Sequence, residues 1–217
     1  MDSEDLVAQL SLLVERKSAD KATRICVAID GPDAAGKTTL ADLLVVKLRT
    51  RAAVLRSSID NWANPSNVRY RRGRESPEGY YFDSFDLARL RRDLLDPFAL
   101  GGDGRCRLVR QDHEGDLSPD VLITVADERC VLLFDGVFLL RPELSQYWDL
   151  SIYLHVNPRS LSNAGSRVTP GTWAARQSPE ISTSIVTCED KRFTRCKRRR
   201  STRQTLWSTT PTSNLRT

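Results

Sequence analysis

A glycine-rich segment has the residue types and spacing of a phosphate-binding loop. Residues 31–38 read Gly-Pro-Asp-Ala-Ala-Gly-Lys-Thr and match the pattern G-x-x-x-x-G-K-[ST]. Glycines at both ends let the backbone curl, so that successive N–H groups point at phosphate oxygens. Lys37 would add a mobile charge at the β- and γ-phosphates, and Thr38 would supply a hydroxyl to Mg²⁺. The segment therefore predicts binding of a nucleoside triphosphate with magnesium.

The residues on either side of this loop have the pattern that such a loop needs. Residues 24–30 form a short β-rich run, and residues 37–49 carry apolar side chains at helical spacing. A helix that starts at the loop aims the positive end of its dipole at the same phosphates. The alternative, an ordinary glycine turn before a helix, is disfavoured because pattern and context agree. The predicted nucleotide-binding residues are Gly31, Asp33, Ala34, Ala35, Gly36, Lys37, Thr38 and Thr39.

An acidic residue follows a second apolar run. Asp135 comes directly after Val131–Phe134, and sites of this kind use an acid at the end of a neighbouring strand to hold the metal, directly or through water. We therefore predict that Thr38 and Asp135 hold Mg²⁺. An aspartate that merely caps the end of a strand is the alternative.

The remaining apolar runs predict the layers that position these residues. Continuous apolar strands suit a parallel sheet covered by helices on both faces. The order of elements predicts an α/β fold, a P-loop three-layer sandwich with a mainly parallel sheet. The other expected elements are helices at 4–17 and 84–95, the latter opened by Ser84 and closed by Asp96-Pro97, strands at 52–55 and 150–156, and a polar loop at 57–79.

Composition excludes several classes of protein. The chain of 217 residues is 40% hydrophobic and 28% charged, as in globular domains. Its longest apolar stretch, 131–140, contains Asp135 and is far shorter than a membrane span. The first five residues are acidic rather than basic and then apolar, so no export segment is visible. Five cysteines without paired spacing argue against a disulfide scaffold. We expect a cytoplasmic protein.

Charge divides the chain near Pro158. Residues 159–217 contain 12 basic and 3 acidic residues, so the net charge of +5 leaves residues 1–158 at −4. The same segment has 20 serines and threonines and no sustained apolar period, and we expect it to be poorly ordered. The predicted organisation is an N-terminal helix at 1–20, a P-loop domain at 21–158 and a basic tail at 159–217.

Three segments resemble the uridine kinase-like branch of the P-loop kinases, which includes uridine kinase and phosphoribulokinase. They are Val-Ala-Ile-Asp-Gly at 27–31, Glu-Ser-Pro-Glu-Gly-Tyr-Tyr-Phe-Asp-Ser-Phe-Asp at 75–86 and Phe-Asp-Gly-Val-Phe-Leu-Leu-Arg-Pro-Glu-Leu at 134–144. The likeness runs from about residue 24 to residue 156. It implies transfer of the γ-phosphate of ATP to a primary hydroxyl, the 5′-hydroxyl when the acceptor is a nucleoside.

The resemblance also assigns roles to residues. Asp60 is the candidate general base, Lys37 the catalytic cation, and Asp83 and Tyr81 the candidate contacts to the sugar and base. A carboxylate suits the base role because the loose transition state needs a positioned hydroxyl more than a strong base. The alternatives are helix-capping roles for Asp60 and Asp83 and a core role for the aromatic residues 80–82. The family often has two adjacent acids and an aromatic residue where this chain has Asp60-Asn61-Trp62.

The tail departs from the family pattern. A uridine kinase would continue after Val156 with an arginine-rich helix and lid, whereas this chain enters polar low-complexity sequence. One interpretation is a genuine basic tail that contacts nucleic acid through counterion release. The preferred hypothesis is translation in a shifted frame, because an offset reading gives arginine from Cys188-Glu189 and glutamine from Asp190-Lys191 unless it meets a stop codon. The coding DNA downstream of Val156 would decide between them.

Other functions remain open at this point. They are a P-loop kinase for another small alcohol such as pantothenate or a sugar phosphate, an ATP-binding but inactive protein that lacks the lid, and a nucleic-acid binder that uses the tail. Self-association into a homo-oligomer is also open, and no membrane partner is expected.

Overall fold

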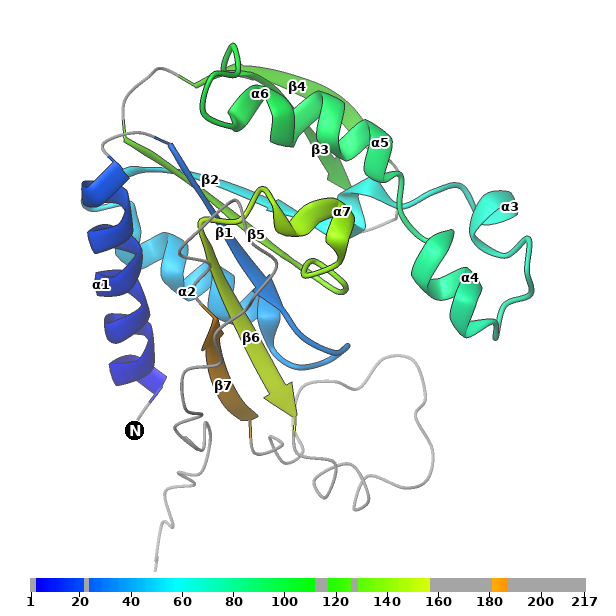
Figure 1. Cartoon of the computed structure of the whole chain (residues 1–217), viewed down its shortest axis with the longest axis horizontal. Coiled ribbons are helices and arrows are strands. Elements are labelled where there is room, and N and C mark those ends of the chain that lie inside the picture. The colour runs from blue at the N-terminus through cyan, green and yellow to red at the C-terminus, as the bar shows by residue number, and fades with distance from the viewer. Residues whose placement is uncertain (1–2, 22–23, 112–116, 126–128, 157–180, 187–217) are drawn as a thin grey trace, which may run out of the picture.

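The computed structural model centres on a five-stranded sheet of order β2-β5-β1-β6-β7 (Figure 1). It describes residues 3–21, 24–111, 117–125, 129–156 and 181–186. The strands of this sheet are β1 (Ile25–Asp30), β2 (Ala53–Ser58), β5 (Cys130–Gly136), β6 (Leu150–Val156) and β7 (Ile181–Val186). β2, β5, β1 and β6 are parallel, and β7 pairs antiparallel to β6. The predicted mainly parallel sheet is confirmed.

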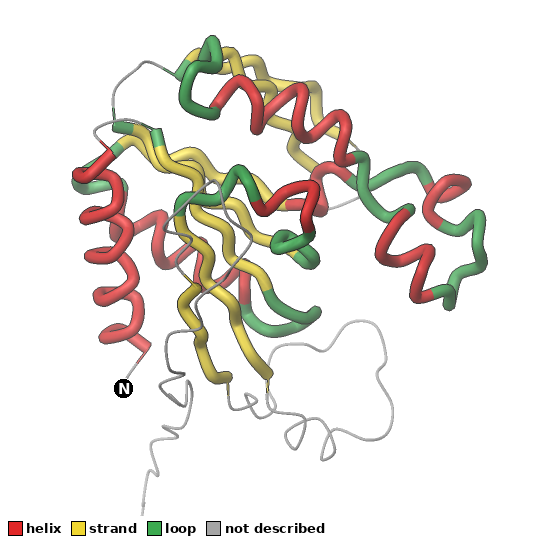
Figure 2. The backbone as a smooth tube through the Cα atoms, viewed as in Figure 1, coloured by secondary structure: helices red, strands yellow, loops and turns green. Residues whose placement is uncertain are grey.

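Side chains alternate between two apolar cores on the two faces of the sheet. Ile25, Val27 and Ile29 of β1 pack with the helices α1 (Ser3–Lys21) and α2 (Lys37–Leu48). Cys26 and Ala28 point into the other core. That core contains residues of α5 (Leu87–Leu90), the π-helical turn η2 (Arg91–Leu95), α6 (Asp96–Phe98) and α7 (Pro142–Ser145). Helices therefore cover both faces (Figure 2), and the three-layer prediction is confirmed.

The helix predicted at 84–95 is displaced in the structure. It begins after Asp86, whose carboxylate accepts a hydrogen bond from the N–H of Arg89 at 2.9 Å. The predicted opening at Ser84 is therefore wrong, because the capping carboxylate lies two residues further on. The predicted stop at Asp96-Pro97 is also wrong. Pro97 lies within α6, near its start, where proline is tolerated.

A second, two-stranded sheet was not predicted. β3 (Arg105–Gln111) pairs antiparallel with β4 (Leu117–Thr124). Cys106 is buried, and Leu108 and Ile123 pack against the same core as α5 and α6. The alternation Arg-Cys-Arg-Leu at 105–108 has the period of a half-buried strand and was the available signal.

Most of the predicted tail lies outside the described residues. This includes 157–180 and 187–217, and with them the positions on which the shifted-frame hypothesis depends. Residues 181–186 form β7, a strand that the sequence analysis did not predict. Ile181, Ile185 and Val186 are β-branched, which suits an extended edge strand. In the part of the chain that the structure describes, no helix is both long and apolar enough to cross a bilayer.

Asp149 joins three elements at the end of the sheet opposite the glycine loop. Its Oδ2 accepts from the N–H of Cys26 at 2.9 Å, and its Oδ1 pairs with Nζ of Lys21 at 2.8 Å. The residue is 5% exposed. It therefore ties the end of α1 to the start of β1 and of β6.

We expect Asp149→Ala to lower the free energy of unfolding by about 2–3 kcal/mol, because it leaves a buried N–H and a lysine without this acceptor. Urea denaturation followed by circular dichroism measures the change. The control is Asp20→Ala, an exposed acid one residue before Lys21, which should change stability by less than about 0.5 kcal/mol. Equal losses in both variants would contradict this role.

Candidate active site

The glycine loop connects β1 to α2 in a conformation that few sequences tolerate. Gly36 has a φ of 82° at the N-cap of α2, and Ala34 has a φ of 58°. An alanine in the left-handed region is uncommon, and such local strain clusters at ligand sites. Ala35 is buried, whereas the predicted loop residues Asp33, Ala34, Gly36, Thr38 and Thr39 are exposed. The loop thus presents most of its predicted contact residues to solvent.

Gly31 passes very close to β6. Its φ is 153°, and a Cβ placed there would lie 2.6 Å from the backbone oxygen of Leu154. We expect Gly31→Ala to lower both stability, by about 2–3 kcal/mol, and nucleotide affinity, because the loop must shift to relieve the clash. Thermal melting and calorimetric titration measure the two effects.

Gly79 provides the matched control for that substitution. A Cβ at Gly79, inside α4 (Pro77–Phe82), would meet its nearest neighbours at 3.4 Å, which is an ordinary contact. Gly79→Ala should therefore stabilise the chain by about 0.5–1 kcal/mol. Unchanged stability and nucleotide affinity in Gly31→Ala would show that the close approach does not constrain the loop.

Two charged residues hold the loop from within. Nζ of Lys37 donates to the backbone oxygen of Pro32 at 2.7 Å. The carboxylate of Asp30 accepts from the N–H of Gly31 at 2.7 Å and from that of Leu140 at 3.1 Å. Burial raises the pKa of Asp30, although these N–H groups and Lys37 act in the opposite direction. Asp30 therefore links the start of the glycine loop to the loop after β5.

The predicted metal residues are in contact. Thr38 Oγ1 donates to Oδ2 of Asp135 at 2.9 Å. Asp135 is 2% exposed, and its Oδ1 pairs with Nη1 of Arg56 at 2.6 Å. Parallel pairing of β1 with β5 explains the contact, because it aligns the last residues of both strands next to the start of α2. Arg56 could not be identified from the sequence, because no local pattern distinguishes it.

The oxygen donors at this place fit magnesium. Mg²⁺ is usually held by one or two carboxylates together with phosphate oxygens and waters. Thr38 and Asp135 offer a hydroxyl and a carboxylate at the end of the glycine loop, where α2 begins. Among the described residues there is no group of three or more histidines, cysteines or acids that could hold a metal alone. The donor set therefore suits a metal that arrives with a nucleotide.

Asp60 lies on a 3-10 helix, η1 (Ile59–Trp62), that directly follows β2. Its side chain is exposed, yet the surrounding protein atoms raise the pKa of its carboxyl. The charges of Asp135 and Asp33 also raise this pKa, while Lys37 lowers it. Asp60 is thus electrostatically coupled to the predicted loop and metal residues. The capping group at this turn is Ser58, whose Oγ accepts from the N–H of Asp60.

A second segment reaches the glycine loop through Tyr80 of α4. The hydroxyl of Tyr80 donates to Oδ2 of Asp33 at 2.7 Å. Burial, followed by this hydrogen bond, raises the pKa of Tyr80. The contact brings residues 77–82, within one of the family-like segments, next to the loop. Nothing in the sequence identified the bond between Tyr80 and Asp33.

Asp83 is buried and carries two ion pairs. Its Oδ1 contacts Nη2 of Arg71, and its Oδ2 lies 2.7 Å from Nε of Arg72. The hydrogen bond from Arg71 is the main cause that lowers the pKa of Asp83, with Arg72 acting in the same direction. The alternative role as N-cap of the following helix is wrong, because Asp86 is the N-cap of α5 and Asp83 is the C-cap of α4. Sugar binding by Asp83 stays a prediction.

Tyr81 belongs to an aromatic cluster beside α4. Its ring centroid lies 5.0 Å from that of Phe138, and the guanidinium of Arg141 lies 4.3 Å above the ring. Nη1 of Arg141 also donates to the backbone oxygen of Tyr81 at 2.9 Å. Arg141 is buried, so this contact fixes the ring and its helix against the loop after β5. Contact of Tyr81 with substrate stays a prediction.

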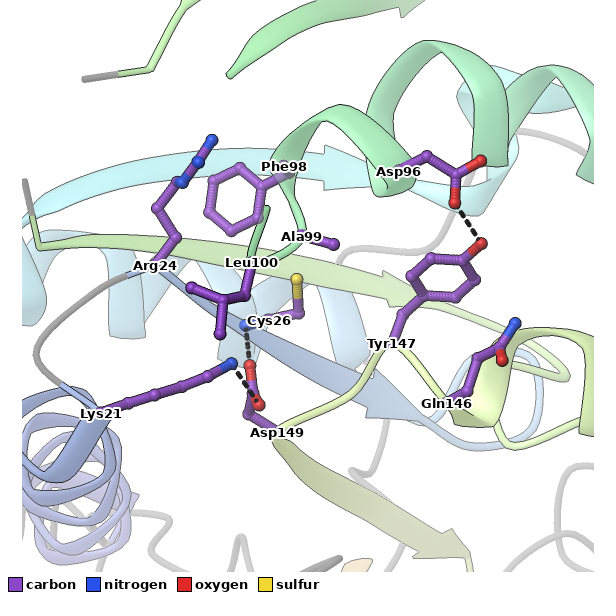
Figure 3. A pocket seen from close by; sticks show the side chains of 10 residues that line it. All are labelled: Lys21, Arg24, Cys26, Asp96, Phe98, Ala99, Leu100, Gln146, Tyr147 and Asp149. Carbon is purple, nitrogen blue, oxygen red and sulfur yellow. Dashed lines mark hydrogen bonds and ion pairs between the residues drawn. The ribbon is translucent and has the colours of Figure 1, made fainter. Parts of the chain in front are cut away.

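A cavity of about 260 Å³ lies elsewhere, at the opposite end of the strands (Figure 3). It is lined by residues that include Lys21, Cys26, Asp96, Tyr147 and Asp149. Its charged groups have partners within the protein: Lys21 pairs with Asp149, Asp96 accepts from the hydroxyl of Tyr147 at 2.5 Å, and Arg24 donates to the backbone oxygens of Pro97 and Gly102. None of the predicted site residues lines it, so we place the candidate active site at the glycine loop.

The fold of this chain is similar to that of P-loop kinases. Its structural neighbours are uridine kinase-like P-loop kinases. One is a "possible uridine kinase" from Bacillus stearothermophilus, with a TM-score of 0.58 and 28% identity over 69% of this chain and 79% of that chain. The resemblance inferred from the sequence is thereby confirmed.

A more distant structure shares the fold alone. A protein from Silicibacter sp. TM1040 that is assigned as a fructose transport system kinase has a TM-score of 0.51 and 23% identity over 74% of this chain and 84% of that chain. D-glycerate 3-kinase from Cryptococcus neoformans matches less well, with a TM-score of 0.43 and 16% identity over 62% of this chain and 52% of that chain. No protein-family model and no curated protein matches the chain.

Proposed function

We propose that the protein transfers the γ-phosphate of ATP to the 5′-hydroxyl of a nucleoside. The observation that carries the proposal is the convergence of Lys37, the Thr38–Asp135 pair and Asp60 around one glycine loop. The 28% identity with the possible uridine kinase supports the nucleoside as acceptor. We also propose the division into an N-terminal helix at 1–20, a kinase domain at 21–158 and a tail at 159–217, and a cytoplasmic location.

Each residue of the site has a proposed role. The N–H groups of the glycine loop bind the phosphates, and Lys37 neutralises charge on them. Asp60 accepts the proton of the attacking hydroxyl. Thr38 and Asp135 would hold Mg²⁺, which neutralises charge on the β- and γ-phosphate oxygens when it is bound. Asp83 and Tyr81 would contact the acceptor.

The sequence of the tail at 159–217 affects the expected rate of phosphoryl transfer. If its sequence lacks the arginines with which related kinases close over ATP, nucleotide binding is expected to remain while transfer falls by roughly 10³- to 10⁵-fold. The alternative function is then an ATP-binding protein without significant kinase activity. The coding DNA downstream of Val156 decides which sequence the cell translates.

A panel of acceptors tests the proposed function. The full chain is incubated with MgATP and each of the common nucleosides, pantothenate and several sugar phosphates, and ADP release is measured. Acceptor-dependent ADP release with a nucleoside supports the proposal, and mass spectrometry of the product locates the phosphate at the 5′ position. Release only with another alcohol would replace the nucleoside assignment, whereas binding of ATP without release in any reaction would favour the inactive alternative.

A further inference from the structure

Arg56 contacts the very carboxylate that we assign to the metal. Its Nη1 lies 2.6 Å from Oδ1 of Asp135, while the hydroxyl of Thr38 donates to Oδ2 of the same group. Asp135 is only 2% exposed. Both oxygens of this buried carboxylate are therefore engaged by donors of the protein itself.

The same arginine reaches a second carboxylate on α2. Its Nε lies 3.4 Å from Oδ1 of Asp42, and its Nη1 also donates to the backbone oxygen of Ser57 at 2.6 Å. The side chain of Asp42 is 65% exposed, whereas that of Arg56 is 20% exposed. Arg56 thus bridges a buried acid at the site and an acid at the surface.

We propose that Arg56 is a resident cation that Mg²⁺ displaces from Asp135, and that Asp42 retains the guanidinium after it is displaced. The inference rests on the proposed function, because it needs the metal to bind at Thr38 and Asp135. A buried carboxylate without a counter-charge is costly, and Arg56 supplies that charge in the nucleotide-free chain. Two cations in contact with one carboxylate repel each other, so binding of the metal must loosen the arginine.

The two partners of Arg56 predict opposite effects on metal binding. Removal of the guanidinium leaves Asp135 free for the metal, so Arg56→Met and Arg56→Gln should raise the affinity for Mg²⁺. Removal of the surface acid deprives the displaced guanidinium of its partner, so Asp42→Asn should lower that affinity. In the Arg56→Met background, Asp42→Asn should have little further effect.

Calorimetric titration of the full chain with the ATP analogue AMP-PNP tests this, first in EDTA and then at increasing Mg²⁺. The measured quantity is the Mg²⁺ concentration that gives half of the metal-dependent gain in affinity. We expect it to fall roughly threefold to tenfold in Arg56→Met and Arg56→Gln, and to rise about twofold to threefold in Asp42→Asn. Arg51→Met removes an exposed arginine that pairs with Glu15 and is the control, with no change expected.

Each outcome distinguishes the inference from the function on which it rests. If AMP-PNP binds in every variant with the same Mg²⁺ dependence, the role of Arg56 is overturned and the proposed function stands. An equal effect of Asp42→Asn with and without Arg56 would overturn the role of Asp42 as its partner. If the folded wild-type chain binds no AMP-PNP under any condition, both proposals fall. Thermal melting confirms that each variant is folded.

Discussion

Replacement of Lys37 by alanine is expected to abolish phosphoryl transfer. Lys37 is the only cationic residue of the sequence 31–38, and it already lies within the loop, bonded to the oxygen of Pro32. Without it, the charge that develops on the transferring phosphate loses a positioned counter-charge, so turnover should fall by roughly 10²- to 10³-fold or more. Steady-state ADP release with a saturating acceptor measures the loss.

The control for this variant is Lys47→Ala, an exposed lysine in the last turn of the same helix, which should keep wild-type turnover. Loss of the bond between Lys37 and Pro32 should cost only about 1 kcal/mol of stability, so the variant is expected to fold. Ordinary turnover in folded Lys37→Ala would remove the glycine loop from the mechanism.

Replacement of Asp60 by asparagine is expected to lower kcat by about 10²-fold while ATP affinity stays nearly intact. Asparagine keeps the shape of the side chain but cannot accept the proton of the hydroxyl. Turnover assays and calorimetric titration with MgATP separate the two effects, and Asp103→Asn in an exposed turn is the control. If ATP affinity collapses instead, Asp60 serves the nucleotide or the metal and is not the base.

The acid limb of the pH profile provides a second readout of Asp60. Its carboxyl has a pKa raised above the ordinary value of 3.8, and a base must be ionised to act. The decline of kcat/KM toward low pH should therefore occur at a higher pH than for an unperturbed aspartate, and it should be absent from the residual activity of Asp60→Asn. If kcat/KM of Asp60→Asn declines toward low pH as it does in the wild-type chain, the decline belongs to the titration of another group.

The raised pKa of Asp60 also determines how this carboxyl changes the stability of the folded chain with pH. The folded chain holds the proton of Asp60 more tightly than the unfolded chain does, so this group favours folding at low pH. That contribution is lost as the pH rises through the raised pKa. At neutral pH, removal of the charge should therefore leave the melting temperature of Asp60→Asn unchanged or raise it, and low turnover would not reflect unfolding.

Local sequence predicted the parts of the site that depend on backbone shape and on strand ends. The loop at 31–38 has a pattern that is itself the binding element, and Asp135 was predicted because it ends a buried strand. The contact between Thr38 and Asp135 follows from these two predictions once β1 and β5 pair. The layers of the fold were predictable for a similar reason, because continuous apolar runs require cover on both faces.

The remaining site contacts could not be predicted because they join residues that are distant in sequence. Arg56 meets Asp135 only because β2 lies next to β5, and Tyr80 reaches Asp33 only because α4 approaches the glycine loop. Helix ends were also mistaken where several capping residues compete, as Ser84 and Asp86 do. The hairpin of β3 and β4 was missed although its alternating pattern was visible.

The central position of β1 in the sheet should make it one of the last strands to unfold. β1 is paired on both sides, with β5 and β6, and all six of its residues are buried. Its amides should therefore be among the last to exchange with deuterium, whereas the edge strand β2 opens at a lower free energy. Partial unfolding that starts at that edge would release Asp60 and Arg56 while the attachment of the glycine loop stays in place.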